Sequence, residues 1–143
     1  MSTLYDADVV AWAEQQALLL RTGQLSLIDI EHIAEEIEDV GKSELHKLES
    51  RLVVLWSHLL KWQYQAERRG SSWQLTIAEQ RRAVERHLRR VPSLKRMLVD
   101  ADWLAEVWMD AMLAAVAETH LTDFPRQRPW PVEQTLDAGF WPE

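Results

Sequence analysis

Three carboxylates, Glu31, Glu35 and Glu38, are the first residues whose spacing could support chemistry. At about 100° per residue, they fall together on one flank of a helix, beside its apolar face. Carboxylates at a seam between helices can bind a metal or act as general acid and base. Di-metal bundles, however, use Glu-x-x-His motifs, and this sequence has only the reversed order, at His32–Glu35 and His46–Glu49. We therefore expect a solvated helix face, with no metal and no cofactor.

His58 is the second residue of interest, because it lies inside the apolar run Val53–Trp62. A histidine in such a run is expected to be at least partly buried, and a buried imidazole needs hydrogen-bond partners. Two interpretations remain open: a core histidine with a structural partner, or a functional group.

Gln80 and Arg81 interrupt the apolar stripe of a later helix. An arginine keeps its charge when it is buried, so it must be paired. We predict that Arg81 engages Glu35 or Glu38, with His58 and Gln80 nearby. This polar cluster either fixes the register of the helices as a buried ion pair or lines a small-molecule pocket.

Helical periodicity predicts the elements that position these residues. The expected helices are Asp6–Arg21, Ser26–Val40, Ser43–Gln65, Ser72–Val91, Ser93–Thr119 with an interruption around Asp100–Asp102, and a short helix Pro131–Ala138. Gly41 is expected to separate the second helix from the third. The third is apolar on nearly every side and should be central. The sequence thus predicts an all-α single domain, residues 1–143, a compact bundle of about five helices with a Pro- and Trp-containing C-terminal tail packed over it.

The expected fifth helix has two apolar faces. Its inward stripe consists of Leu104, Trp108, Ala111 and Ala115, and further apolar residues lie on another side of the helix. A second apolar face needs a second cover, which is either the C-terminal tail or another subunit. We favour a homodimer, with a candidate interface of Trp103, Met109, Leu113 and Val116.

Charge and composition exclude several classes of protein. The formal net charge of −7 argues against general attraction to nucleic acid. Arg81–Arg96 holds seven basic residues against one acidic residue, but they are spread around the helix without interleaved aromatic residues. No apolar run approaches the ~20 residues that span a bilayer. The absence of cysteine and of a signal-like N-terminus favours a cytoplasmic protein.

Several short motifs, taken in order, resemble a bacterial family called domain of unknown function 29. They are Ala34–Asp39 (AEEIED), Ser43-Glu44, His58–Gln65 (HLLKWQYQ), Ser72-Trp73, Pro92–Leu94 and Phe124-Pro125. The resemblance covers essentially the whole chain, from Tyr5 to Glu143. It implies an all-helical, single-domain bacterial protein, and it implies no activity, because the family has no established catalytic residues.

These observations together predict a small protein-binding or self-associating module, more a binding protein than an enzyme. The alternative is a small-ligand-binding protein or an enzyme that uses the cluster of Glu35, Glu38, His58, Gln80 and Arg81.

Overall fold

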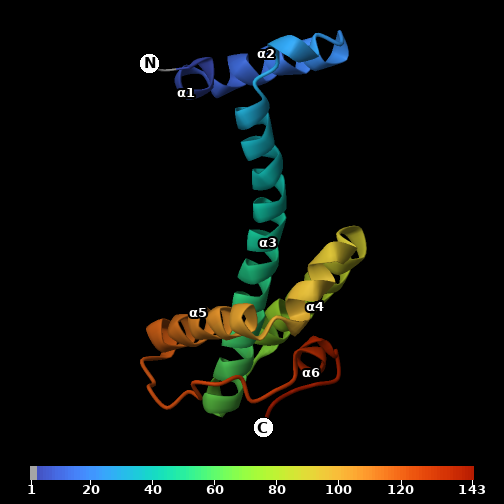
Figure 1. The fold of residues 1–143 in the computed structure, drawn as a ribbon. Helices are drawn as coiled ribbons and strands as arrows, with labels where there is room; N and C mark the ends of the chain where they lie inside the picture. The colour runs from blue at the N-terminus through green and yellow to red at the C-terminus, as the bar shows by residue number, and fades with distance from the viewer. Residues whose placement is uncertain (1–2) are drawn as a thin grey trace. The chain divides into compact units, whose positions relative to one another are not determined.

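The computed structural model describes residues 3–143, and within this part of the chain every regular element is helical (Figure 1). The prediction of an all-α fold is confirmed. The helices divide between two compact units, Met1–Glu44 and Leu45–Glu143, called here the first and second units. The assignment of residues 1–143 to one domain stays a prediction.

The first unit begins with two helices where the sequence predicted one. α1 spans Leu4–Ala7 and α2 spans Val9–Arg21. Between them Asp8 adopts an extended backbone, and its carboxylate accepts a hydrogen bond from the Ala11 amide at 3.1 Å. Asp6, the first residue of the predicted helix, instead completes a capping box with Thr3 at the start of α1. Aspartate is a preferred N-cap residue, so Asp8 begins a new helix within the apolar pattern that predicted one continuous helix.

α3 is a single helix, Ile30–Tyr64, that runs through Gly41. The predicted break at Gly41 and the predicted start of a separate helix at Ser43 are therefore wrong. A glycine inside a helix costs only about 1 kcal/mol relative to alanine, and the neighbouring residues are good helix formers. Gly41 has no atom within 4 Å of the position that a Cβ would take, so no close packing requires a glycine here. A short 3₁₀ turn, η1 (Leu25–Leu27), leads into α3.

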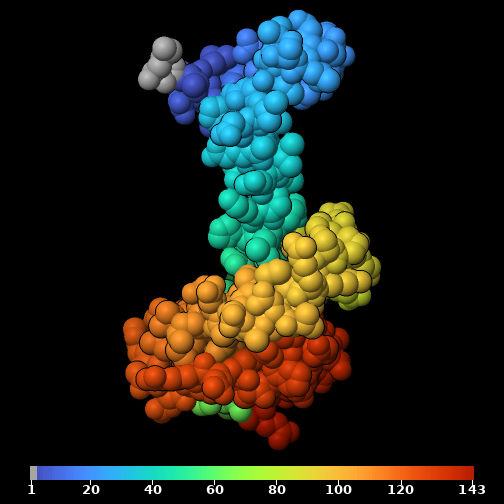
Figure 2. Space-filling view, in the orientation of Figure 1, coloured from blue at the N-terminus to red at the C-terminus, as the bar shows by residue number. Residues whose placement is uncertain are grey.

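The C-terminal part of α3 is the centre of the second unit, as predicted. Leu48, Leu52, Leu55, Trp56 and Leu59 are fully buried. In the space-filling view, α4, α5 and the tail cover most of this part of α3 on the face shown (Figure 2). The elements around it are η2 (Ala66–Arg68), α4 (Ser71–Arg90), η3 (Pro92–Val99), α5 (Ala101–Thr119) and α6 (Val132–Leu136).

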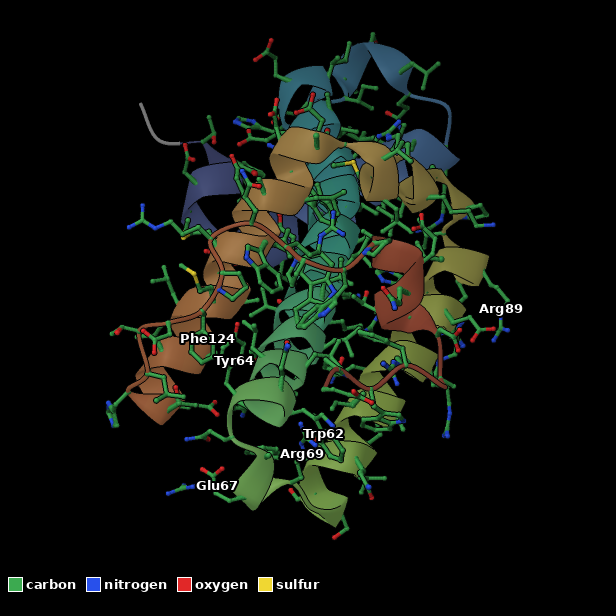
Figure 3. All side chains as sticks on the ribbon, turned by 90° about the horizontal axis from the view of Figure 1, so that it is seen from below. Trp62, Tyr64, Glu67, Arg69, Arg89 and Phe124 are labelled. Carbon is green, nitrogen blue, oxygen red and sulfur yellow. The ribbon has the colours of Figure 1, made fainter. Side chains whose placement is uncertain are left out.

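The C-terminal tail packs on this core, which confirms the prediction for residues 121–143. Trp56 donates a hydrogen bond through Nε1 to Thr135 Oγ1 at 3.0 Å, and Trp108 donates to the Pro125 carbonyl at 3.0 Å. At the end of α3, Tyr64 meets the edge of Phe124, and Arg69 lies over the ring of Trp62 (Figure 3). The tail is thus part of the core of the second unit.

Candidate functional site

Arg81 is buried, as predicted, but its partners are carbonyl oxygens of the tail. Nε donates to Thr135 O at 2.9 Å, Nη1 to Ala138 O at 3.4 Å, and Nη2 to Phe140 O at 2.6 Å. The guanidinium also lies 5.3 Å from the ring centre of Trp141. Three donor groups of one side chain therefore hold three points of the C-terminal tail.

The predicted pairing of Arg81 with Glu35 or Glu38 is wrong. Both glutamates belong to the first unit, and no ion pair joins either of them to Arg81 within the described part of the chain. The Arg81 guanidinium is instead hydrogen-bonded to backbone carbonyls, because the last turn of α6 and the irregular chain after it leave carbonyl oxygens free to accept. Gln80 precedes Arg81 on α4, and its side-chain oxygen is buried without a hydrogen-bond partner among the described residues.

His58 takes part in a different polar cluster. Its Nδ1 hydrogen-bonds to the Val54 carbonyl at 2.8 Å, so the imidazole presents Nε2 to the Lys61 ammonium 3.5 Å away. Lys61 is buried, forms a salt bridge with Glu118 and lies 5.4 Å from the Trp73 ring centre. Burial lowers the pKa of His58, and the nearby Lys61 lowers it further. A neutral histidine beside a paired lysine is consistent with a structural link between α3 and α5.

Lys61 and Glu118 were missed by the sequence analysis. The sequence did carry a signal for Lys61, since it is the one Lys or Arg inside the apolar run Val53–Trp62. Glu118 gave no such signal, because it lies at the exposed end of α5. Only the packing of α5 against α3 brings its carboxylate to the lysine.

A second cluster that the sequence did not indicate lies in the first unit. Asp29 caps α3 by accepting from the His32 amide at 3.3 Å, and its carboxylate lies 2.6 Å from His32 Nδ1. The same carboxylate accepts from Trp12 Nε1 at 3.0 Å, and Gln16 Oε1 accepts from the Asp29 amide at 2.7 Å. These contacts join α2 to the start of α3.

Tyr5 completes this cluster from α1. Its ring stacks on His32 with 4.0 Å between ring centres, and its hydroxyl donates to Glu36 at 2.6 Å. That hydrogen bond raises the pKa of Tyr5 to about 12. The Asp29 hydrogen bond raises the pKa of His32, and the same bond lowers the pKa of Asp29. These three pKa shifts result from the hydrogen bonds that join α1, α2 and α3.

Little else covers the apolar residues of the first unit. Among its described residues, Trp12 is the only buried hydrophobic side chain. On α3, Ile30 is 68% exposed, and Ile37 and Val40 are each 67% exposed. Further exposed apolar residues of this unit are Leu4, Val9, Val10, Leu18, Leu20, Leu25 and Leu27. Large contiguous apolar surfaces on folded proteins mark sites of interaction.

The first unit is also strongly acidic. Residues 1–44 contain ten acidic residues against Arg21 and Lys42, a formal charge of −8, whereas residues 45–143 have a formal charge of +1. Glu31, Glu35 and Glu38 are exposed, and none forms an ion pair within the described part of the chain. The ribbon is therefore solvated, as predicted, and it borders an apolar stripe that is also exposed.

The candidate interface on α5 is divided. Trp103 is buried and donates through Nε1 to Glu49 at 2.9 Å, and Val116 packs against the core of the second unit. Met109 and Leu113 remain 40% and 55% exposed. Two of the four residues predicted at the interface are thus covered within the chain itself.

The described residues contain no group of three or more His, Cys, Asp or Glu side chains arranged to hold a metal ion. None of the described helices combines the length and apolar character needed to cross a membrane.

Compared with models of known families, residues 4–141 match the domain of unknown function DUF29. The chain belongs to the DUF29 family. The match covers both units, so the acidic, apolar first unit lies within the DUF29 region together with the tail that Arg81 holds. Comparisons with curated proteins and with solved structures gave no significant match.

Proposed function

We propose that this DUF29 protein is a protein-binding module whose docking surface is the apolar face of its first unit. The observation that carries the proposal is the exposure of Ile30, Ile37 and Val40, about two thirds each, on a unit whose described residues include one buried hydrophobic side chain. Burying each such side chain against a partner would contribute about 1.5 kcal/mol or more. The bacterial origin and cytoplasmic location predicted from the sequence are part of this proposal.

The occupant is a different protein rather than a second copy at this same face. A contact between two first units would bring together formal charges of −8 on each side. Like charges facing each other across an interface are costly and are used to suppress wrong partners. The small-ligand alternative has weaker support, because the guanidinium of Arg81 is taken up by tail carbonyls.

Site-specific photo-crosslinking in the cells that produce the protein tests the proposal. A crosslinker at Ile37 should yield an adduct with one other protein, and V40E in the same chain should abolish it. A crosslinker at Glu67, on an exposed turn of the second unit, is the control. An adduct of two copies, a crosslink within one chain, or an adduct that V40E leaves unchanged would contradict the proposal.

Self-association through α5 is a second candidate, favoured by the exposure of Met109 and Leu113 one turn apart. Sedimentation over a range of protein concentrations should then show a dimer that L113E dissociates. A monomer at all concentrations would exclude it.

A further inference from the structure

The exposed residues of α3 in the first unit form a stripe with helical spacing. Ile30, Ile33, Ile37 and Val40 alternate in steps of three and four, which places them on one face of the helix. Ile33 is half-buried and the other three are exposed. Another helix can insert its side chains between residues spaced in this way, whereas the side chains of a strand alternate every two residues.

The acidic ribbon lies along one border of this stripe. Taking Ile37 as reference and about 100° per residue, Glu38 and Glu31 project some 100–120° away, whereas Glu35, at about 160°, lies near the far side of the helix. All three are exposed and outside any ion pair in the described residues. A partner that covers the stripe would therefore have its polar flank beside the carboxylates of Glu31 and Glu38.

The partner must supply apolar and basic side chains together. The basic helix α4 of the chain itself does not combine them: it carries exposed Arg82, Arg86, Arg89 and Arg90, but its one large exposed hydrophobic residue is Leu75. An anionic membrane surface is excluded by the charge of the first unit, since it would be repelled.

We infer that the first unit binds a basic amphipathic helix of another protein, with its apolar face on Ile30, Ile37 and Val40 and its Lys or Arg residues beside Glu31 and Glu38. This inference rests on the proposed function and specifies the chemistry of the partner. The mode is the helix-in-groove type of recognition, in which apolar anchors give affinity and charge gives orientation and selectivity.

Titration of the full-length protein with synthetic peptides of about 18 residues tests the inference. The first peptide has a Leu stripe at helical spacing with Lys elsewhere, the second has Glu in place of Lys, and the third scrambles the first. Only the Leu/Lys peptide should bind, and its binding should weaken as salt is raised from about 50 to about 300 mM. Equal binding of the Leu/Glu or scrambled peptide, or no binding of any, would overturn the inference.

Variants then locate the contact. I37E/V40E should weaken binding of the Leu/Lys peptide at least tenfold, and E31Q/E38Q should weaken it by about fivefold. The matched controls in the second unit, L75E and E106Q/D110N, should leave it unchanged, since all three residues are exposed there. Loss of affinity in the controls but not in the first-unit variants would overturn the inference.

The two proposals can fail separately. If Ile37 crosslinks to a protein through a segment that is neutral or acidic, the proposed function stands and the basic-helix inference fails. If Ile37 yields no adduct with another protein, the proposed function fails, whatever the peptides do.

Discussion

His32 and His58 show how the pKa of the same side chain shifts in opposite directions in different surroundings. His32 hydrogen-bonds a carboxylate, which raises its pKa, whereas burial lowers the pKa of His58. A histidine whose pKa is raised in the folded state stabilises that state at pH values below its unfolded-state pKa. This contribution is lost as the pH rises through the folded-state pKa. Asp29, with a lowered pKa, contributes above its ordinary value of 3.8. The Asp29–His32 pair therefore stabilises the first unit most between about pH 4 and pH 6.5.

NMR titration of the imidazole signals checks this assignment. His32 should titrate above its ordinary pKa of 6.5 and His58 below it. D29N should bring the pKa of His32 back toward 6.5 and leave that of His58 unchanged. The reverse order of the two histidines would mean that these contacts do not form in solution.

Arg81 should contribute strongly to the stability of the second unit. R81M removes three hydrogen bonds and leaves tail carbonyls without donors, so the free energy of unfolding should fall by about 3 kcal/mol. R81K, which keeps the charge but not the planar fork, should be intermediate. Denaturant unfolding measures the effect, with the exposed neighbour variant R82M as control. A loss for R81M no larger than that for R82M would show that the tail does not depend on this side chain.

At the scale of elements, the continuity of α3 is the principal finding. A helix that passes through Gly41 carries residues of both units. The apolar residues Ile30, Ile37 and Val40 before the glycine are exposed, whereas Leu48, Leu52 and Leu55 after it are buried.

The glycines provide the test of this continuity. G41A should raise the free energy of unfolding of the first unit by about 0.5–1 kcal/mol, because Gly41 is helical and has open space at the Cβ position. G23A is the matched control and should destabilise by about 1 kcal/mol, since Gly23 has φ of +73°. Thermal unfolding followed by circular dichroism compares the two. Destabilisation by G41A would indicate a break in the helix.

At the scale of the whole molecule, stability is unevenly distributed between the two units. The buried hydrophobic residues lie almost entirely in residues 45–143, where the tail, α4 and α5 surround α3. The first unit depends on Trp12 and on the hydrogen bonds of Asp29. A unit with so little buried apolar area opens at a lower free energy than one with a full core.

Hydrogen exchange should reveal this difference along one helix. Amides of α3 before Glu44 should exchange faster than those after Leu48, although both segments have the same helical hydrogen bonds. Mass spectrometry of exchanged peptides measures it, and addition of the Leu/Lys peptide should slow exchange in the first segment alone. Uniform protection along α3 would contradict the uneven distribution of stability.

Local patterns determined much of this protein by sequence alone. The spacing of apolar residues predicted the helices, the burial of Leu52, Leu55 and Leu59, the interruption before α5 and the short helix in the tail, because these depend on residues close in the chain. The solvated acidic ribbon followed from the same periodicity.

The tertiary structure decided which polar groups meet. The sequence indicated that Arg81 needs partners. It could not indicate that backbone carbonyls supply them, since every residue has a carbonyl. The tail brought carbonyl oxygens to Arg81, and the packing of α5 on α3 brought Glu118 to Lys61. Burial and pairing depend on residues far apart in the chain, and local periodicity carries no signal for them.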